Sequence, residues 1–270
     1  DAIVTHPQIR AVSFTGEVAT GKQVSSRAAP LLKRLTLELG GSDPMIICRD
    51  ADLTDAAKGA ISGRFFNCGQ TCTAVKRLIV DETVADEVTR KLQALISSLR
   101  VGNGLETGVD LGPVHTERQR ETVLSQVNRT VEEDYGKLGA GGRIPVSSDL
   151  KDGFFLEPTL LTDLDPQAPV LQEEVFGPVL PVLTYSSLDD AVSLANQTRF
   201  GLGASVWTHD SRIISRMCTD LQAGIVWVNQ HLKIPPEVPF GGTKESGSGR
   251  ENGRYALEHY LEEKTVLIRP

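Results

Sequence analysis

The sequence predicts an α/β fold, and two observations lead to this prediction. Short apolar segments of strand length alternate with segments of helical spacing along the 270 residues of the chain. The composition, with 40% hydrophobic and 23% charged residues, is that of an ordinary soluble globular protein. The chain is long enough for one large domain or two ordinary ones, with a substantial hydrophobic core.

In the first 100 residues the expected strands are short runs rich in Leu, Ile and Val, over 9–14, 34–39, 44–48 and 76–82. The expected helices between them cover 21–29, 52–63 and 83–99. Asp50 or Asp52 is a suitable N-cap for the second helix, and apolar residues recur at helical spacing along the third.

The alternation continues after a glycine-rich loop over 101–116. Further helices are expected over 117–131, 188–197 and 212–223, and strands over 155–164, 180–185, 204–209 and 224–230. The small and polar residues of 139–143 and 146–153 predict surface loops.

The net charge, the apolar runs and the cysteine content argue against several classes of protein. A net charge of -7 argues against nucleic acid or an anionic membrane surface as the main partner. No apolar run approaches the roughly 20 residues of a membrane span, and the first ten residues lack the apolar segment of a signal peptide. Four cysteines are few for a disulfide scaffold, so free thiols in a reducing cytoplasm are expected. No compact set of Cys and His residues predicts a metal site.

The segment FTGEVATGKQV (14–24) is similar to a phosphate-binding P-loop, because Lys22 follows the glycine pair Gly16 and Gly21. A P-loop needs Ser or Thr after the lysine to hold magnesium, and Gln23 stands there instead. This mismatch argues against a nucleotide triphosphatase.

Cys72 lies in an unusual stretch, FFNCGQTCTAVKR (65–77), between a predicted helix and a predicted strand. Cys48 and Cys218 have the apolar neighbours that are typical of structural cysteines. A thiol among hydroxyls and free backbone amides can have its thiolate stabilised, as a nucleophile requires. The local pattern leaves open whether Cys72 is a nucleophile or an ordinary loop cysteine.

Glu38 lies in LELGG, at the end of an apolar strand that runs into two glycines. A carboxylate in this place is either a solvated strand-end residue or a partly desolvated base with a raised pKa. The paired glycines allow another backbone or a ligand to approach closely.

Five motifs in this chain resemble the aldehyde dehydrogenase superfamily, NAD(P)-dependent enzymes with a cysteine nucleophile. In order, they are FTGEVATG, LELGG, FNCGQTC, EEVFGPV (173–179) and PFGGTKESGSGRE (239–251). The resemblance extends over essentially the whole chain, and five motifs in the right order are far more specific than any one of them.

The resemblance implies that Cys72, rather than Cys68, attacks the carbon of an aldehyde to give a thiohemiacetal. The backbone amide of Cys72 would hold part of the oxyanion. After hydride transfer to the nicotinamide, Glu38 would activate the water that hydrolyses the thioester to a carboxylic acid. Family members that pass the acyl group to coenzyme A lack this glutamate, so Glu38 favours hydrolysis.

The resemblance also implies the binding residues. NAD is the expected cofactor, with NADP as the alternative; Glu174 would hold the nicotinamide ribose hydroxyls, and Phe176 would pack beside the ring. The other expected cofactor contacts are Gly16, Glu17, Leu39 and Gly40, with the glycine turn placing helix-terminal amides beside phosphate. The expected substrate pocket contains Phe66, Thr71, Thr73, Asn229 and Phe240, with Trp227 either beside it or in the core.

Two positions depart from the family pattern. Glu17 stands where the family often has Ser, and its carboxylate would repel a pyrophosphate unless it points away. Ser42 replaces the lysine that often follows LELGG.

Family members are nearly twice as long, and a first residue other than Met also suggests a fragment. On this analogy residues 1–40 end a Rossmann-like dinucleotide-binding domain, and 41–240 form a catalytic domain with a twisted, mostly parallel sheet flanked by helices. Residues 241–260 would return to the cofactor domain. Residues 261–270 would form an oligomerisation strand that pairs with a neighbouring subunit in a homodimer or homotetramer.

Two alternatives remain open beside the dehydrogenase hypothesis. The chain could be a catalytically inactive structural or interaction module, since weak or no cofactor binding is expected without the rest of the cofactor domain. Cys72 could also give cofactor-independent esterase activity.

Overall fold

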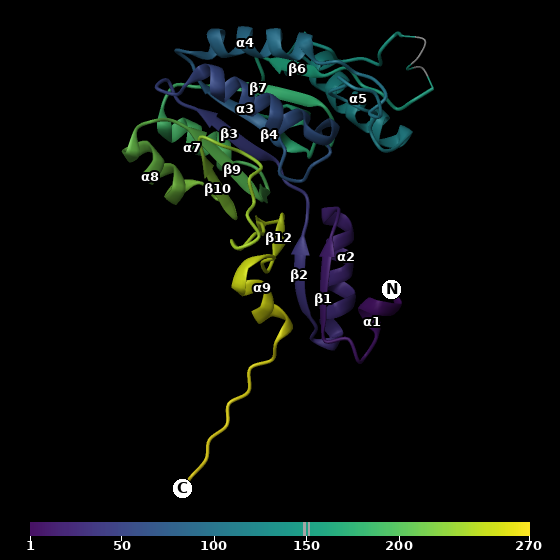
Figure 1. The fold of residues 1–270 in the computed structure, drawn as a ribbon, viewed down its shortest axis with the longest axis vertical. Coiled ribbons are helices and arrows are strands. Elements are labelled where there is room, and N and C mark those ends of the chain that lie inside the picture. Colours follow the sequence, from purple (N-terminus) through teal and green to yellow (C-terminus); the bar gives the residue numbers. More distant parts are fainter. Residues whose placement is uncertain (148–149, 151) are drawn as a thin grey trace.

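The chain forms a large sheet with helices and a smaller unit of parallel strands, which meet where β2 leads into β3 (Figure 1). The computed structural model describes residues 1–147, 150 and 152–270. The surface loop predicted over 146–153 therefore lies partly outside the described residues. The predicted α/β class is confirmed.

The smaller unit is built on β1 (Ala11–Thr15) and β2 (Arg34–Glu38), which pair in parallel and place Thr15 opposite Glu38. α2 (Val18–Ala28) connects these two strands. β12 (Gly247–Ser248) pairs antiparallel with β2, so Glu38 ends the central strand of a three-stranded sheet. The short elements of this unit are α1 (Ala2–Thr5), η1 (Ala29–Leu31) and α9 (Gly253–Tyr260).

The large sheet has seven strands in the order β10-β9-β3-β4-β7-β6-β5, and all neighbours are parallel except β5 and β6. The strands are β3 (Asp43–Ile47), β4 (Val75–Asp81), β5 (Lys137–Ala140), β6 (Thr159–Thr162), β7 (Val179–Tyr185), β9 (Gly203–Trp207) and β10 (Ile225–Val228). β8 (Phe200–Gly201) and β11 (Thr243–Lys244) form a separate antiparallel pair. Every residue of β3, β4 and β9 is buried, as expected for parallel strands covered on both faces.

Helices lie on both faces of the large sheet (Figure 1). They are α3 (Leu53–Phe65), α4 (Ala85–Ser98), α5 (Glu117–Glu132), α6 (Pro169–Gln172), α7 (Leu188–Asn196), α8 (Ser211–Asp220) and the short η2 (Phe66–Gly69). The side chain of Asp52, rather than Asp50, caps α3 by accepting from the N–H groups of Thr54 and Asp55. Asp50 instead accepts from the N–H groups of His209 and Asp210 after β9.

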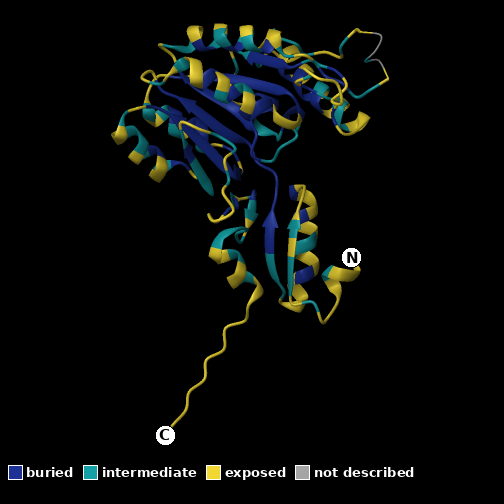
Figure 2. Cartoon of the chain, viewed as in Figure 1, coloured by how far each residue is buried: buried dark blue, intermediate teal, exposed yellow. Residues whose placement is uncertain are grey.

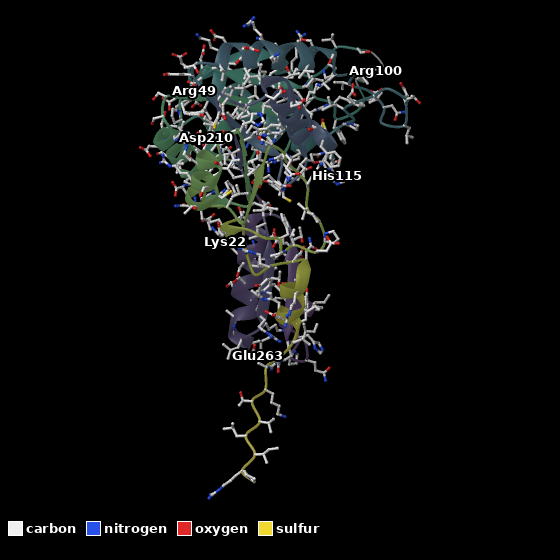
Figure 3. All side chains as sticks on the ribbon, turned by 60° about the vertical axis from the view of Figure 1, so that its left-hand side comes forward. Lys22, Arg49, Arg100, His115, Asp210 and Glu263 are labelled. Carbon is white, nitrogen blue, oxygen red and sulfur yellow. The ribbon has the colours of Figure 1, made fainter. Side chains whose placement is uncertain are left out.

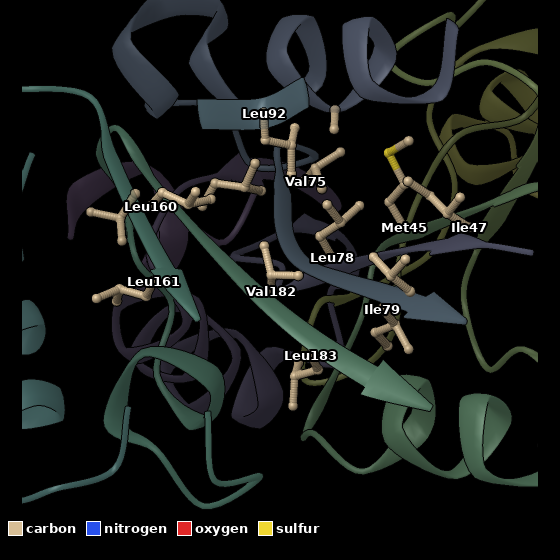
Figure 4. Packing of buried hydrophobic residues seen from close by; sticks show 14 of the residues in the cluster. Met45, Ile47, Val75, Leu78, Ile79, Leu92, Leu160, Leu161, Val182 and Leu183 are labelled. Atoms are coloured by element: carbon tan, nitrogen blue, oxygen red, sulfur yellow. The ribbon is translucent and has the colours of Figure 1, made fainter. Parts of the chain in front are cut away.

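The hydrophobic core fills the space between the large sheet and its helices (Figure 4). Met45, Leu78, Ile79 and Leu92 are fully buried there. Figure 2 shows the buried strands in dark blue and the exposed outer surfaces of the helices in yellow. Burial of this apolar surface stabilises the sheet and thereby fixes the loops at its ends.

One segment differs from the predictions. Residues 139 and 140, expected in a loop, belong to β5, whose pairing with β6 shifts register between Leu138 and Ala140. A bulge of this kind lets a glycine-rich segment still act as an edge strand. Of residues 261–270, Leu261 and Glu262 contact Arg34 and Arg10, and the others extend away from the rest of the chain (Figure 1), with Leu267 92% exposed. They pair with none of the described strands, so their pairing with another subunit stays a prediction.

Candidate active site

Glu38 lies at the junction of the two units, at the carboxyl end of β2. The N–H of Gly16 donates to the Glu38 carbonyl over 3.0 Å, and the N–H of Leu39 donates to the Ser246 carbonyl over 2.9 Å. The strand end is therefore held from the β1 side and from the β12 side.

The Glu38 carboxyl group is buried, with the residue only 4% exposed. Neither oxygen has a hydrogen-bond partner within the described part of the chain. Burial, together with the negative charge of Glu251, raises the pKa of Glu38 to about 8, and Arg250 acts in the opposite direction. The solvated alternative for Glu38 is therefore wrong, and a carboxylate of this pKa can take up and release a proton near neutral pH.

Gly21, in the P-loop-like segment, has a packing role. A Cβ on Gly21 would lie 2.5 Å from a methyl carbon of Leu39, so the missing side chain lets α2 approach the segment after Glu38. Lys22 lies near the junction (Figure 3) and forms a 2.9 Å ion pair with Glu245. Glu17 is the exposed N-cap residue of α2. Its contact with a cofactor stays a prediction, as do those of Gly16 and Leu39.

The cysteine loop turns sharply before it reaches Cys72. Asn67, Cys68 and Gly69 have consecutive φ values of 50°, 55° and 72°. Two of these residues are not glycine, and such backbone strain is found preferentially at functional sites. Cys72 follows this turn and is partly buried.

The thiol of Cys72 is less acidic than its polar neighbours led us to expect. Burial raises its pKa, while the charge of Lys76 and the N–H of Thr73 act in the opposite direction. The thiol is buried deeply enough that this effect outweighs the hydroxyls and amides around it. Cys68 is 5% exposed and burial raises its pKa to about 12, which fits Cys72 rather than Cys68 as nucleophile.

The backbone at Gly69 leaves no room for a side chain. It has a φ of 72°, and a Cβ there would lie 2.3 Å from the carbonyl oxygen of Gly177. We expect Gly69→Ala to lower the free energy of unfolding by about 2–3 kcal/mol, because neither the backbone angle nor the space suits a side chain. Urea unfolding measures this, with Gly104→Ala as control because nothing lies within 4 Å of its Cβ position. Equal stability of the two variants would contradict the prediction.

Three segments of the site meet at the ammonium group of Lys76, on β4. It donates to the Gly41 carbonyl at 2.9 Å, to the Cys72 carbonyl at 2.8 Å and to Glu174 Oε1 at 2.8 Å. The N–H of Gly41 also donates to Glu174 Oε1, at 3.2 Å. A Cβ on Gly40 would lie 1.9 Å from Glu174 Oε2, so this glycine leaves the space that the carboxylate occupies.

A second buried cation holds the segment that follows Glu174. Arg64, fully buried at the end of α3, donates to the carbonyls of Val175 and Gly177. Gln119 Nε2 donates to the Phe176 carbonyl between them at 2.9 Å. Phe176 is thus fixed through its backbone and through both neighbours.

The predicted pocket residues lie in different surroundings. Phe66 is 64% exposed, whereas Thr73 is 2% exposed and Phe240 is 8% exposed. The Asn229 side chain exchanges two 3.0 Å hydrogen bonds with the backbone of Thr208. Thr71 is partly buried in the loop before Cys72. The pocket role of all five stays a prediction.

His231 is tied to the residue after Cys72. Its Nε2 lies 2.8 Å from the Thr73 carbonyl and its Nδ1 lies 2.9 Å from Ser205 Oγ. A carbonyl only accepts, so Nε2 carries the proton and Nδ1 accepts from the serine. Burial lowers the pKa of His231 to about 4, so the ring is neutral. It packs against Trp227, which is 3% exposed and donates to the Lys233 carbonyl, as a core residue does.

Sequence reasoning missed Arg64, Lys76 and Glu251. A lysine followed by an arginine inside an apolar strand is the signal that marks Lys76, because such charges are rarely buried without partners. Glu251 reaches the site because Phe240 and Glu251 exchange two 2.7 Å backbone hydrogen bonds. This backbone pairing could not be predicted from the sequence, because the two residues are eleven apart in an irregular segment.

The described residues contain neither a metal-binding cluster nor a membrane-spanning helix. Among the described residues, no group of three or more His, Cys, Asp or Glu side chains is arranged to hold a metal ion. Within the same residues, no helix has the length and apolar character needed to cross a membrane.

The comparison with protein families decides the family. A model described as "Aldehyde dehydrogenase family" matches residues 1–266. The chain belongs to the aldehyde dehydrogenase family. Relatives of this aldehyde dehydrogenase chain include phenylacetaldehyde dehydrogenase of Pseudomonas fluorescens, 40% identical over 99% of this chain and 53% of the relative. Another is the peroxisomal aminoaldehyde dehydrogenase 2 of Pisum sativum, 42% identical over 98% of this chain and 52% of the relative.

Solved structures agree with this assignment. Betaine aldehyde dehydrogenase from Staphylococcus aureus in complex with NAD+ matches with a TM-score of 0.93 and 36% identity, over 96% of this chain and 51% of that one. An NAD-dependent aldehyde dehydrogenase from Sinorhizobium meliloti gives a TM-score of 0.92, with 36% identity over 96% of this chain and 50% of that one. The chain spans about half the length of the relatives it matches.

Proposed function

We propose that this aldehyde dehydrogenase chain carries the catalytic part of an enzyme that oxidises an aldehyde to the carboxylic acid, with NAD, or NADP, as hydride acceptor. The observation that carries the proposal is the cluster in which Lys76 joins the Cys72 carbonyl to Glu174. The same cluster contains Gly41, three residues after Glu38. A nucleophile, a base and a carboxylate for cofactor binding thus lie on segments that contact one another.

The residues present fit a nicotinamide dinucleotide. The Glu174 side chain is 20% exposed, and it lies in the space that Gly40 leaves free. A carboxylate in this position can accept hydrogen bonds from ribose hydroxyls, and Phe176 on the neighbouring segment can pack against a ring. When bound, the nicotinamide supplies the acceptor for the hydride.

In the proposed mechanism Cys72 forms the covalent bond to substrate. Its thiolate attacks the carbonyl carbon, and the backbone N–H of Cys72 donates to the developing oxyanion. Once the hydride has left, the acyl group is a thioester on the sulfur of Cys72. Glu38 takes a proton from water, the hydroxide oxygen bonds to the acyl carbon, and the Cys72 thiolate leaves.

The test is an assay of the intact protein with a panel of aldehydes, NAD or NADP, and coenzyme A present or absent. Formation of the free acid that does not depend on coenzyme A supports the proposal. An absolute requirement for coenzyme A would exclude hydrolysis with Glu38 as base. Failure to bind either dinucleotide would favour the inactive structural module.

The raised pKa of Glu38 predicts the pH dependence of deacylation. Glu38 is a base only when ionised, so the hydrolysis rate should rise with pH, with a midpoint near pH 8. Glu251→Gln removes a charge that raises this pKa and should move the midpoint to lower pH. Arg250→Gln removes a charge that lowers it and should move the midpoint to higher pH. Single-turnover hydrolysis of an acyl-enzyme measures the midpoint, and identical midpoints in both variants would contradict the assignment.

The proposed assembly is a homodimer or homotetramer in which 261–270 pair with another subunit. The exposure of Val266, Leu267 and Ile268, at 67%, 92% and 85%, supports this pairing. All four cysteines are free thiols, which fits the proposed cytoplasmic location.

A further inference from the structure

Lys76 is a lysine with no access to solvent. Its side chain is 0% exposed, and its three hydrogen bonds go to the Gly41 carbonyl, the Cys72 carbonyl and Glu174 Oε1. An ammonium group has three protons, so each one has a separate acceptor. The three acceptors come from three segments: the loop after β2, the cysteine loop and the loop before β7.

The charges around Lys76 are also buried. Asp43 is 1% exposed; its Oδ1 accepts from the Gly203 N–H at 3.0 Å, and its Oδ2 has no hydrogen-bond partner among the residues described. Burial raises the pKa of Asp43 to about 7, and Lys76 and Arg77 lower it. In the same way, Lys76 opposes the effect of burial on the pKa of Cys72. The positive charge of Lys76 therefore acts on Asp43 and Cys72 at once.

The neighbouring Arg77 shows what a purely structural buried cation does on the same strand. It donates to the carbonyls of Ser42, Leu194 and Ala195. None of these residues is expected to react or to bind cofactor. The bonds of Lys76, by contrast, reach both the nucleophile residue and the proposed ribose-binding carboxylate.

We propose that Lys76 is a positioning residue that fixes the Cys72 peptide and the Glu174 carboxylate relative to each other. This inference rests on the proposed function, because Cys72 and Glu174 have their roles only in that reaction. One ammonium sets the position of both groups and places a positive charge beside the thiol. Removing one member of a buried ion pair is destabilising, because it leaves the partner charge unpaired, so the folding of each variant is checked by circular dichroism before its reactivity is compared.

The experiment compares Lys76→Met with the unchanged intact protein. Alkylation of Cys72 by iodoacetamide is followed against pH, with the modified peptide identified by mass spectrometry. We expect the midpoint to rise by about one pH unit and alkylation at pH 7 to slow about tenfold, since the thiolate loses its nearest cation. We also expect KM for NAD to rise about tenfold with little change in KM for the aldehyde, because Glu174 then keeps only the longer hydrogen bond from the Gly41 N–H.

Two variants serve as controls. Lys244→Met removes the same charge from a lysine that donates to the carbonyls of Asn196 and Thr198, and it should leave the alkylation midpoint unchanged. Lys76→Arg keeps the charge but alters the geometry, so it should keep the midpoint while KM for NAD rises. This second variant keeps the test valid if Lys76→Met does not fold.

Two results would overturn the inference. One is an unchanged midpoint and an unchanged KM for NAD in folded Lys76→Met. The other is a midpoint shift in Lys244→Met as large as that in Lys76→Met. The alkylation arm needs no cofactor or turnover, so failure of the inference is distinguished from failure of the proposed function, in which no aldehyde would be oxidised at all.

Discussion

Replacing Cys72 by serine is expected to reduce aldehyde oxidation by at least about 1000-fold, because an unactivated hydroxyl is a far weaker nucleophile than a thiolate. The intact protein is assayed for NAD(P)H formation with a saturating aldehyde. The fold should be retained, since Cys72 is partly buried and the exchange replaces a single atom.

Cys68→Ser is the matched control, because Cys68 lies four residues earlier in the same loop and is buried. It should retain most of the activity. An undiminished rate in Cys72→Ser would remove Cys72 from the mechanism. Hydrolysis of p-nitrophenyl esters by Cys72→Ala tests the esterase alternative separately: unchanged hydrolysis would exclude Cys72 as an esterase nucleophile.

The second large effect is expected for Glu38→Gln. Loss of the base should slow hydrolysis of the acyl-enzyme by about 100-fold to 10,000-fold, because glutamine cannot take the proton from water. Acylation should change far less. Rapid-quench measurements give the two rates separately, and a burst of NAD(P)H followed by a slow steady state is the expected signature.

A second glutamate, Glu245, provides the control for Glu38→Gln. Glu245→Gln removes a carboxylate that instead pairs with Lys22 and Arg199, and it should leave deacylation unchanged. If the acyl-enzyme of Glu38→Gln has the lifetime of the unchanged protein, another group is the base.

The sequence predicted the regular part of the fold well, because buried parallel strands are continuous apolar runs. β3 is an example, because its apolar run Met45, Ile46 and Ile47 is fully buried, as the pattern indicates. β5 was missed because Gly139 and Ala140 carry little strand propensity, and pairing with β6 decides their conformation. Local strand propensity carries no information about this tertiary contact, so the strand could not be predicted from it.

The sequence predicted individual site residues but not the surroundings that the fold gives them. The alternation around Glu38 left two environments possible, and burial at the junction of two units selects one of them. The pKa direction at Cys72 depended on burial, which its polar neighbours in the sequence did not show. Lys76 could have been suspected from its place in an apolar strand, but its three acceptors lie 35, 4 and 98 residues away along the chain.

The most direct test of the central claim is peptide mass mapping of Glu38→Gln, quenched during turnover with aldehyde and NAD. We expect a mass increase equal to the acyl group on the peptide that contains Cys72, and none on the peptides of Cys48 or Cys218. An acyl group on another residue, or turnover with no acyl-enzyme at any quench time, would contradict it.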